Sequence, residues 1–116
     1  MGVARRQRIR SGRDFREIYS EGRVVRNRQL VIYFRPAPSA HSRLGLSVSR
    51  RHGNAVRRNR IKRVLREVFR TMTDRIPEPL DVILIPRRGP DAEVYAANRD
   101  AFIHLMRKIS KATGRT

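Results

Sequence analysis

Residues 50–66 carry the side chains best suited to chemistry with a partner molecule. Eight arginines or lysines and one histidine stand in this stretch, and none of its residues is acidic. Apolar residues recur from its middle onward at the i, i+3, i+4 and i+7 spacing of a helix with one buried face. They are Ile61, Val64, Leu65, Val68, Phe69 and Met72. A helix that is anchored by one face and cationic on the other is a rigid surface for gripping a polyanion.

On a helical wheel the charges collect opposite this apolar arc. The opposite arc holds Asn59, Lys62, Arg63, Arg66 and Arg70, and Arg58 and Arg60 stand at its two borders. Glu67 follows Arg63 by four residues, so we predict an ion pair between them. The stripe favours contact with nucleic acid, and a solvated helix face is the alternative.

Two asparagines, Asn54 and Asn59, interrupt the basic segment. Each can turn or cap the backbone, and each can hydrogen-bond a base edge or a 2′-hydroxyl. For Asn54, just ahead of the helix, we favour the cap. For Asn59, in a helix interior where asparagine has poor propensity, we favour a functional contact.

Three aromatic residues, Phe15, Tyr19 and Tyr33, could stack on unpaired bases. Such stacking contributes about 1–3 kcal/mol per base and tolerates any sequence. Aromatics at helical or strand spacing more often belong to the core, which is the alternative, above all for Phe15. The hydroxyls of Tyr19 and Tyr33 favour a wet edge, so we expect these two at a surface cleft.

Residues 43–50 alternate as a strand does. One face carries Leu44, Leu46 and Val48; the other carries Gly45, Ser47 and Ser49. The first face belongs to the core. The second has so little side-chain bulk that it would leave the sheet open to a ligand.

Nothing in the sequence indicates an active site made of protein alone. The three histidines are scattered without metal-ligand spacing, cysteine is absent, and no phosphate-binding glycine loop occurs. We therefore expect no catalytic residue, no metal site and no cofactor bound by the protein itself.

Length and charge restrict the partner. The 116 residues make one domain, 1–116, and the formal net charge is +18. Repulsion among so many like charges destabilises the compact chain unless a permanently anionic partner offsets it; nucleic acid is the first candidate and an anionic membrane surface the second. The preference for arginine over lysine suits RNA, although genome composition explains it equally well. No apolar run is long enough to span a bilayer, and we expect a cytoplasmic protein.

The elements that must position these residues follow from local patterns. We predict a mobile basic arm at 1–10, then a helix capped by Ser11 with Asp14 as its capping-box partner and ended by Gly22. Strands follow at 24–27, 29–35 and 43–50, and the basic helix at about 55–73. The unbroken apolar run 82–85 is typical of a strand covered on both faces and parallel to a neighbour. Asp91 would cap a final helix. The order is α-β-β-β-α-β-α, an α+β sandwich around a mostly antiparallel sheet with one parallel pair.

The basic segment resembles the signature of the bacterial ribonuclease P protein subunit. The resemblance rests on Ser49-Arg50-Arg51-His52-Gly53-Asn54-Ala55-Val56 and on Arg57-Arg58-Asn59-Arg60-Ile61-Lys62-Arg63, whose Arg-Asn-Arg triplet is that family's motif. It extends over nearly the whole chain, through Asp14-Phe15, Gly22, Asn27-Arg28, Tyr33 and Gly45-Leu46-Ser47-Val48-Ser49.

The resemblance implies a central four-stranded mixed sheet and a left-handed β-α-β crossover through the basic helix, against the usual right-handed rule. It also implies a subunit of a ribonucleoprotein endonuclease that removes the 5′ leader from precursor tRNA, with Mg²⁺ and the catalytic centre in the RNA subunit. The expected partners are that catalytic RNA and precursor tRNA, with neither membrane nor DNA.

Carried over by position, the resemblance divides the site residues into two sets. The catalytic RNA would meet Arg50, Arg51, Asn54, Arg57, Arg58, Asn59, Arg60, Lys62, Arg63 and Arg66. The single-stranded leader would meet Phe15, Tyr19, Tyr33, Ser47 and Ser49.

The chain departs from many relatives at two places. Arginine replaces lysine at positions 50 and 51, which keeps the charge, and His52 replaces an aliphatic residue. For His52 packing, capping and RNA contact all stay open. The alternative function is a small basic RNA-binding or ribosomal protein without a processing role. A DNA-binding protein is disfavoured because no helix-turn-helix pattern occurs.

Overall fold

The structure, a computed structural model, describes residues 3–114. Its helices and strands follow the predicted order α-β-β-β-α-β-α. The helices are α1 (Gly12–Glu21), α2 (Ala55–Thr71) and α3 (Tyr95–Ala112), and the strands are β1 (Arg23–Arg26), β2 (Leu30–Pro36), β3 (Arg43–Leu46) and β4 (Leu80–Pro86). The described residues also form three short 3₁₀ turns: η1 (Arg5–Gln7) ahead of α1, η2 (Arg50–His52) and η3 (Thr73–Arg75).

The four strands form one mixed sheet in the order β1-β2-β4-β3. β4 is antiparallel to β2 and parallel to β3, so the chain passes from β3 to β4 through α2. This confirms the predicted crossover through the basic helix; the hand of that crossover stays a prediction.

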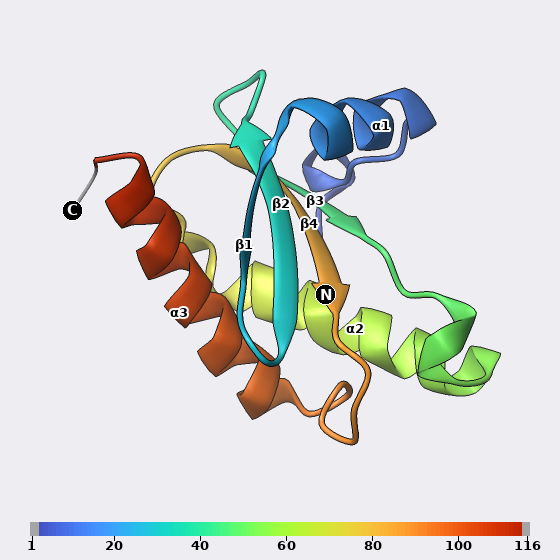
Figure 1. The fold of residues 1–116 in the computed structure, drawn as a ribbon. Helices are drawn as coiled ribbons and strands as arrows, with labels where there is room; N and C mark the ends of the chain where they lie inside the picture. Colours follow the sequence, from blue (N-terminus) through green and yellow to red (C-terminus); the bar gives the residue numbers. More distant parts are fainter. Residues whose placement is uncertain (1–2, 115–116) are drawn as a thin grey trace.

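The helices cover the two faces of the sheet unequally (Figure 1). α2 and α3 pack on one face, where Leu30, Val82 and Leu84 of the sheet are buried. α1 lies on the other face, where its Ile18 packs against Ile83. β4 is therefore covered on both faces, as its unbroken apolar run predicted.

Residues 3–10, for which a mobile basic arm was predicted, lie against the edge of the sheet. Val3 and Ile9 are buried, and the backbone N–H of Ile9 donates to Leu44 O at 2.9 Å along the outer edge of β3. Two apolar residues within a basic run are enough to seat it, and the contact protects an edge strand. Residues 1 and 2 lie outside the described part of the chain.

Two predicted boundaries are wrong. β3 ends at Leu46, and η2 then occupies Arg50–His52, where the strand was expected to end. Asp91 does not cap the last helix, since residues around it form a turn in which Val94 N–H donates to Asp91 O at 3.0 Å. Val94 takes the cap position, and the buried Asn98 amide donates to Ala92 O and Val94 O.

Candidate nucleic-acid interface

α2 presents the predicted cationic stripe above a buried face. Ile61, Leu65, Val68 and Phe69 are fully buried, and Val64 and Met72 pack partly buried against the same core. The free cations stand on η2 and the exposed side of α2. They are Arg50, Arg51, Arg58, Arg60, Lys62, Arg63 and Arg66, none of which forms an ion pair within residues 3–114. Their charge is thus available to a partner.

The predicted pair between Glu67 and Arg63 is wrong. Glu67 pairs with Arg70, whose Nε donates to Glu67 Oε2 at 3.1 Å and whose Nη2 contacts Oε1. The planar fork of Arg70 meets both carboxylate oxygens at once. This contact lowers the pKa of Glu67 and raises that of Arg70. Arg63 is left exposed without an acidic partner in the described chain.

The two asparagines have the different environments expected of them. Asn54 caps α2, its Oδ1 accepting from the backbone N–H of Arg57 at 2.9 Å. Asn59 is exposed, and its side chain makes no hydrogen bond to any residue from 3 to 114. The amide of Asn59 is therefore available to RNA, whereas that of Asn54 is engaged by the helix.

Arg57 and His52 serve the protein's own backbone. Arg57 Nη1 donates to His52 O and its Nη2 to Gly89 O, both at 2.8 Å. His52 is buried, and its Nε2 lies 2.7 Å from Pro86 O. Of the three roles open for His52, the structure shows packing, combined with a hydrogen bond to the end of β4.

The three aromatic residues gather on the α1 face of the sheet. Tyr19 stands edge-on to Tyr33 with ring centroids 4.9 Å apart, and Phe15 lies 6.3 Å from Tyr19. Tyr19 is 39% exposed, and the other two are half-buried. The row offers ring faces and edges to a ligand while its base packs on Ile18 and Ile83.

A hollow of 410 Å³ joins this aromatic row to the basic helix. Its walls come from the N-terminal segment, α1, β3 and α2: Val3, Arg8, Ile9, Arg10, Phe15, Leu44, Gly45, Leu46, Lys62 and Arg66. Lys62 and Arg66 therefore share a surface with Phe15. One RNA strand could stack on the ring and meet both cations.

The bare face of β3 is occupied in part by Phe15 itself. A Cβ added to Gly45 would lie 2.7 Å from Phe15 Cζ, so glycine is what allows the ring to rest on the strand. Ser47 and Ser49, expected at the leader site, do not line the hollow among the described residues. Ser49 caps η2 instead, accepting from Arg51 N–H at 3.3 Å.

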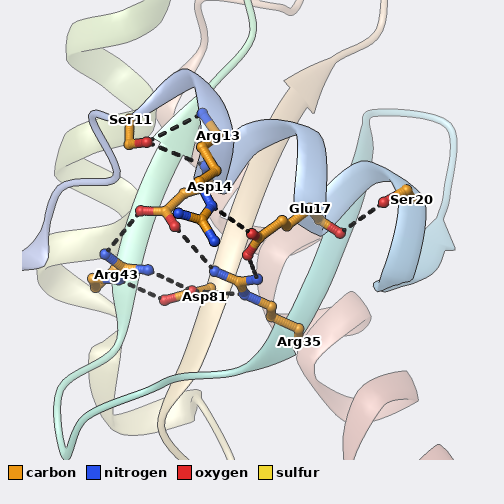
Figure 2. Close-up of polar contacts among 8 residues, drawn as sticks. All are labelled: Ser11, Arg13, Asp14, Glu17, Ser20, Arg35, Arg43 and Asp81. Atoms are coloured by element: carbon orange, nitrogen blue, oxygen red, sulfur yellow. Dashed lines mark hydrogen bonds and ion pairs between the residues drawn. The ribbon is translucent and has the colours of Figure 1, made fainter.

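An ionic network fixes α1, and with it Phe15 and Tyr19, against the sheet (Figure 2). Asp81 of β4 is fully buried between Arg35 of β2 and Arg43 of β3, each its register partner on the neighbouring strand. Arg43 donates to Asp81 at 2.8 and 2.7 Å, and Arg35 Nε donates to it at 3.1 Å.

The same two arginines reach up to the helix. Arg35 pairs with Glu17 at 3.2 Å, and both arginines approach Asp14 at 3.5 Å. Asp14 thus serves the network, and the predicted capping box is reduced to Ser11, whose Oγ accepts from the backbone N–H groups of Arg13 and Asp14.

Charges in this network stabilise one another. Hydrogen bonds from Arg35, then Arg13, lower the pKa of Glu17. The hydrogen bonds of Asp81 raise the pKa of Arg43. Burial acts to lower the pKa of Arg35, but hydrogen bonds to Asp81 and Glu17 outweigh it and the pKa rises. These ion pairs hold α1, and with it the aromatic row, in place on the sheet.

Sequence reasoning missed Arg8 and Arg10, which stand in the hollow. The available signal was Val3 and Ile9, two apolar residues that seat a segment otherwise basic. Within residues 3–114, no group of histidine, aspartate and glutamate side chains is arranged to hold a metal ion, and no helix is apolar enough over a sufficient length to cross a bilayer.

Comparison with known families covers nearly the whole chain. The family model described as Ribonuclease P matches residues 3–110. The chain is 38% identical over 109 residues to the ribonuclease P protein component of Thermotoga maritima, which covers 90% of this chain and 93% of that relative.

Solved structures agree in fold as well as in sequence. The ribonuclease P protein of Staphylococcus aureus shares 39% identity, covers 90% of this chain and 95% of its own, and superposes with a TM-score of 0.76. The Thermotoga maritima protein shares 36% identity over 87% of this chain and 96% of its own, with a TM-score of 0.77.

Proposed function

This chain belongs to the bacterial ribonuclease P protein family, and from that premise we propose how its surface divides the work of the subunit. As a protein subunit of ribonuclease P, it serves the maturation of tRNA 5′ ends. The cationic stripe of η2 and α2 binds the catalytic RNA, and the aromatic row with its adjoining hollow binds the single-stranded leader of precursor tRNA. The chain would act in the cytoplasm, where its RNA partners are.

One observation carries this division. Free cations and stackable rings lie on different elements but meet at a single hollow, where Phe15 stands with Lys62 and Arg66. Phosphates of a structured RNA need fixed charges, which a helix anchored by four fully buried residues provides. Unpaired leader bases need ring surfaces, which the ionic network under α1 holds in position.

The same surface suggests how the protein assists without a catalytic residue of its own. We place the cleaving centre and its Mg²⁺ in the RNA subunit, as the family resemblance implies. A leader held in the hollow would fix the strand on the 5′ side of the scissile bond. Contacts between the hollow and the leader would raise the affinity for precursor tRNA over that for mature tRNA, which lacks a leader.

Reconstitution tests the proposal. The protein is combined with a bacterial ribonuclease P RNA at low Mg²⁺, and cleavage of precursor tRNA is followed. We expect stimulation over RNA alone; the same rate with and without protein would overturn the processing role and favour a ribosomal or other RNA-binding protein.

The salt dependence of RNA binding provides an independent measure. If about five to seven phosphates are contacted, log K against log[salt] has a slope of about −4 to −6. A nearly flat line would contradict the assignment of the stripe to RNA.

A further inference from the structure

We propose a phosphate-binding site for RNA on the loop that follows β4, residues 87–90, completed by Arg51 and positioned by Arg57. This inference rests on the proposed function and extends the RNA surface beyond η2 and α2. Within the described chain, Arg51, Arg87 and Arg88 are exposed and their side chains make no ion pair or hydrogen bond.

The loop has a defined course. As the chain leaves β4, the backbone N–H of Arg87 donates to Gln29 O at 2.9 Å. Gln29 Nε2 in turn donates to Asp91 O at 2.9 Å and Asn98 Oδ1 at 3.2 Å. The loop is thus tied at both ends to the β1–β2 hairpin, and Arg87 and Arg88 project from a fixed backbone.

Arg57 ties this loop to the start of the basic helix. Its two terminal nitrogens donate to His52 O and Gly89 O, so one guanidinium bridges η2 and the loop. The stem of Arg57 passes over Gly53, where an added Cβ would lie 3.1 Å from Arg57 Cδ and where φ is +118°. Glycine at 53 therefore makes room for the bridge and for the turn.

The Arg57 bridge forms one wall of an open pocket of 570 Å³. Its lining residues are Arg51, Arg57, Arg88, Gly89 and Pro90. Among the described residues no carboxylate lines it; Glu93 lies near Arg57, with its Oε1 3.9 Å from Arg57 Nε.

The chemistry of this pocket selects a phosphate of a polymer. Forked guanidinium groups meet phosphate oxygens in a bidentate manner. The site is open, Pro90 is the one apolar side chain among its described lining residues, and Arg51 of η2 stands in it. An RNA strand bound along α2 can therefore continue into it. Arg57 is a positioning residue here, because its donors are engaged by carbonyl oxygens.

The test is a double-mutant cycle on full-length protein binding to ribonuclease P RNA, measured across a salt series. Arg88→Ala and Arg57→Ala are made singly and together. Arg75→Ala serves as the matched control, since Arg75 is exposed on η3 at the opposite end of β4. Urea unfolding of each variant separates loss of binding from loss of fold.

We expect Arg88→Ala to weaken binding about 3- to 10-fold and to reduce the salt slope by about 1, with Arg75→Ala unchanged. We expect Arg57→Ala to weaken binding too. In the Arg57→Ala protein, the added Arg88→Ala change should reduce RNA affinity by a smaller factor than it does alone, because the loop is then no longer held.

Each other outcome has one meaning. If the unaltered protein binds RNA and stimulates cleavage but Arg88→Ala behaves as Arg75→Ala does, the phosphate site is overturned and the proposed function stands. Full additivity of the two losses overturns the positioning role of Arg57. Failure of the unaltered protein to bind RNA overturns the proposed function and this site with it.

Discussion

Replacing Gly45 with alanine should disturb the leader site through a single contact. The new Cβ would lie 2.7 Å from Phe15 Cζ and 3.1 Å from Phe15 Cε1. Non-bonded carbon atoms normally stand about 3.5–4.0 Å apart. The ring must therefore retreat by about 1 Å, and Ile83 Cγ1, 3.3 Å from the added Cβ, closes the other direction.

The size of the effect follows from the packing. Overpacking of this kind costs about 1–3 kcal/mol of unfolding free energy. For a domain of this length, 1 kcal/mol shifts the melting temperature by about 4 °C, so we expect a loss of about 4–12 °C. Because Phe15 also forms the wall of the hollow, binding of leader-bearing precursor to the holoenzyme should weaken, while affinity for the catalytic RNA changes little.

Thermal unfolding and precursor binding measure the two effects. Gly12→Ala is the control, because its Cβ would meet only Arg16 Nη1, at 3.4 Å, on the exposed first turn of α1. That variant should be as stable as the unaltered protein or slightly more so. If Gly45→Ala matched Gly12→Ala in both stability and precursor affinity, Phe15 would not rest on β3 as described.

Three further outcomes are expected. Asp81→Asn should lower the urea unfolding free energy by about 3 kcal/mol, because two arginines lose a fully buried partner; an unchanged midpoint would contradict that role. Arg35 is the main cause of the lowered pKa of Glu17, so the stability that Glu17 contributes should be complete above its ordinary pKa of 4.5 and lost as pH falls through the lowered value. Glu17→Gln should therefore make the urea midpoint of unfolding depend less on pH between about pH 6 and 3. Asn54→Ala should cost about 1 kcal/mol of stability, whereas Asn59→Ala should spare stability and weaken RNA binding; reversed results would exchange their roles.

Local pattern predicted the parts of this fold that depend on burial. The apolar run of β4 and the helical spacing of Ile61, Leu65 and Phe69 each report which side of an element meets the core, and the structure confirms both. The Asn54 cap was predictable for a different reason, because a cap is a contact between near neighbours in sequence.

Features that depend on the register of the strands could not be predicted from the sequence. Arg35, Arg43 and Asp81 stand far apart in sequence, and only the pairing of β2 and β3 with β4 brings them side by side. The hydrogen bond from Arg57 to Gly89 O could likewise not be predicted, because it depends on the course of the loop after β4. Of these three arginines only Arg57 was predicted to meet RNA, and the structure shows its guanidinium donating to His52 O and Gly89 O.

The division of the surface into a leader site and a catalytic-RNA site is the central claim, and one paired comparison tests it most directly. Tyr33→Ala and Arg63→Ala holoenzymes are each measured for catalytic-RNA affinity and for the ratio of precursor to mature tRNA affinity. We expect Tyr33→Ala to lower the precursor-to-mature ratio about fivefold or more while catalytic-RNA affinity holds, and Arg63→Ala to do the reverse. Equal losses in both quantities for both variants would contradict the division.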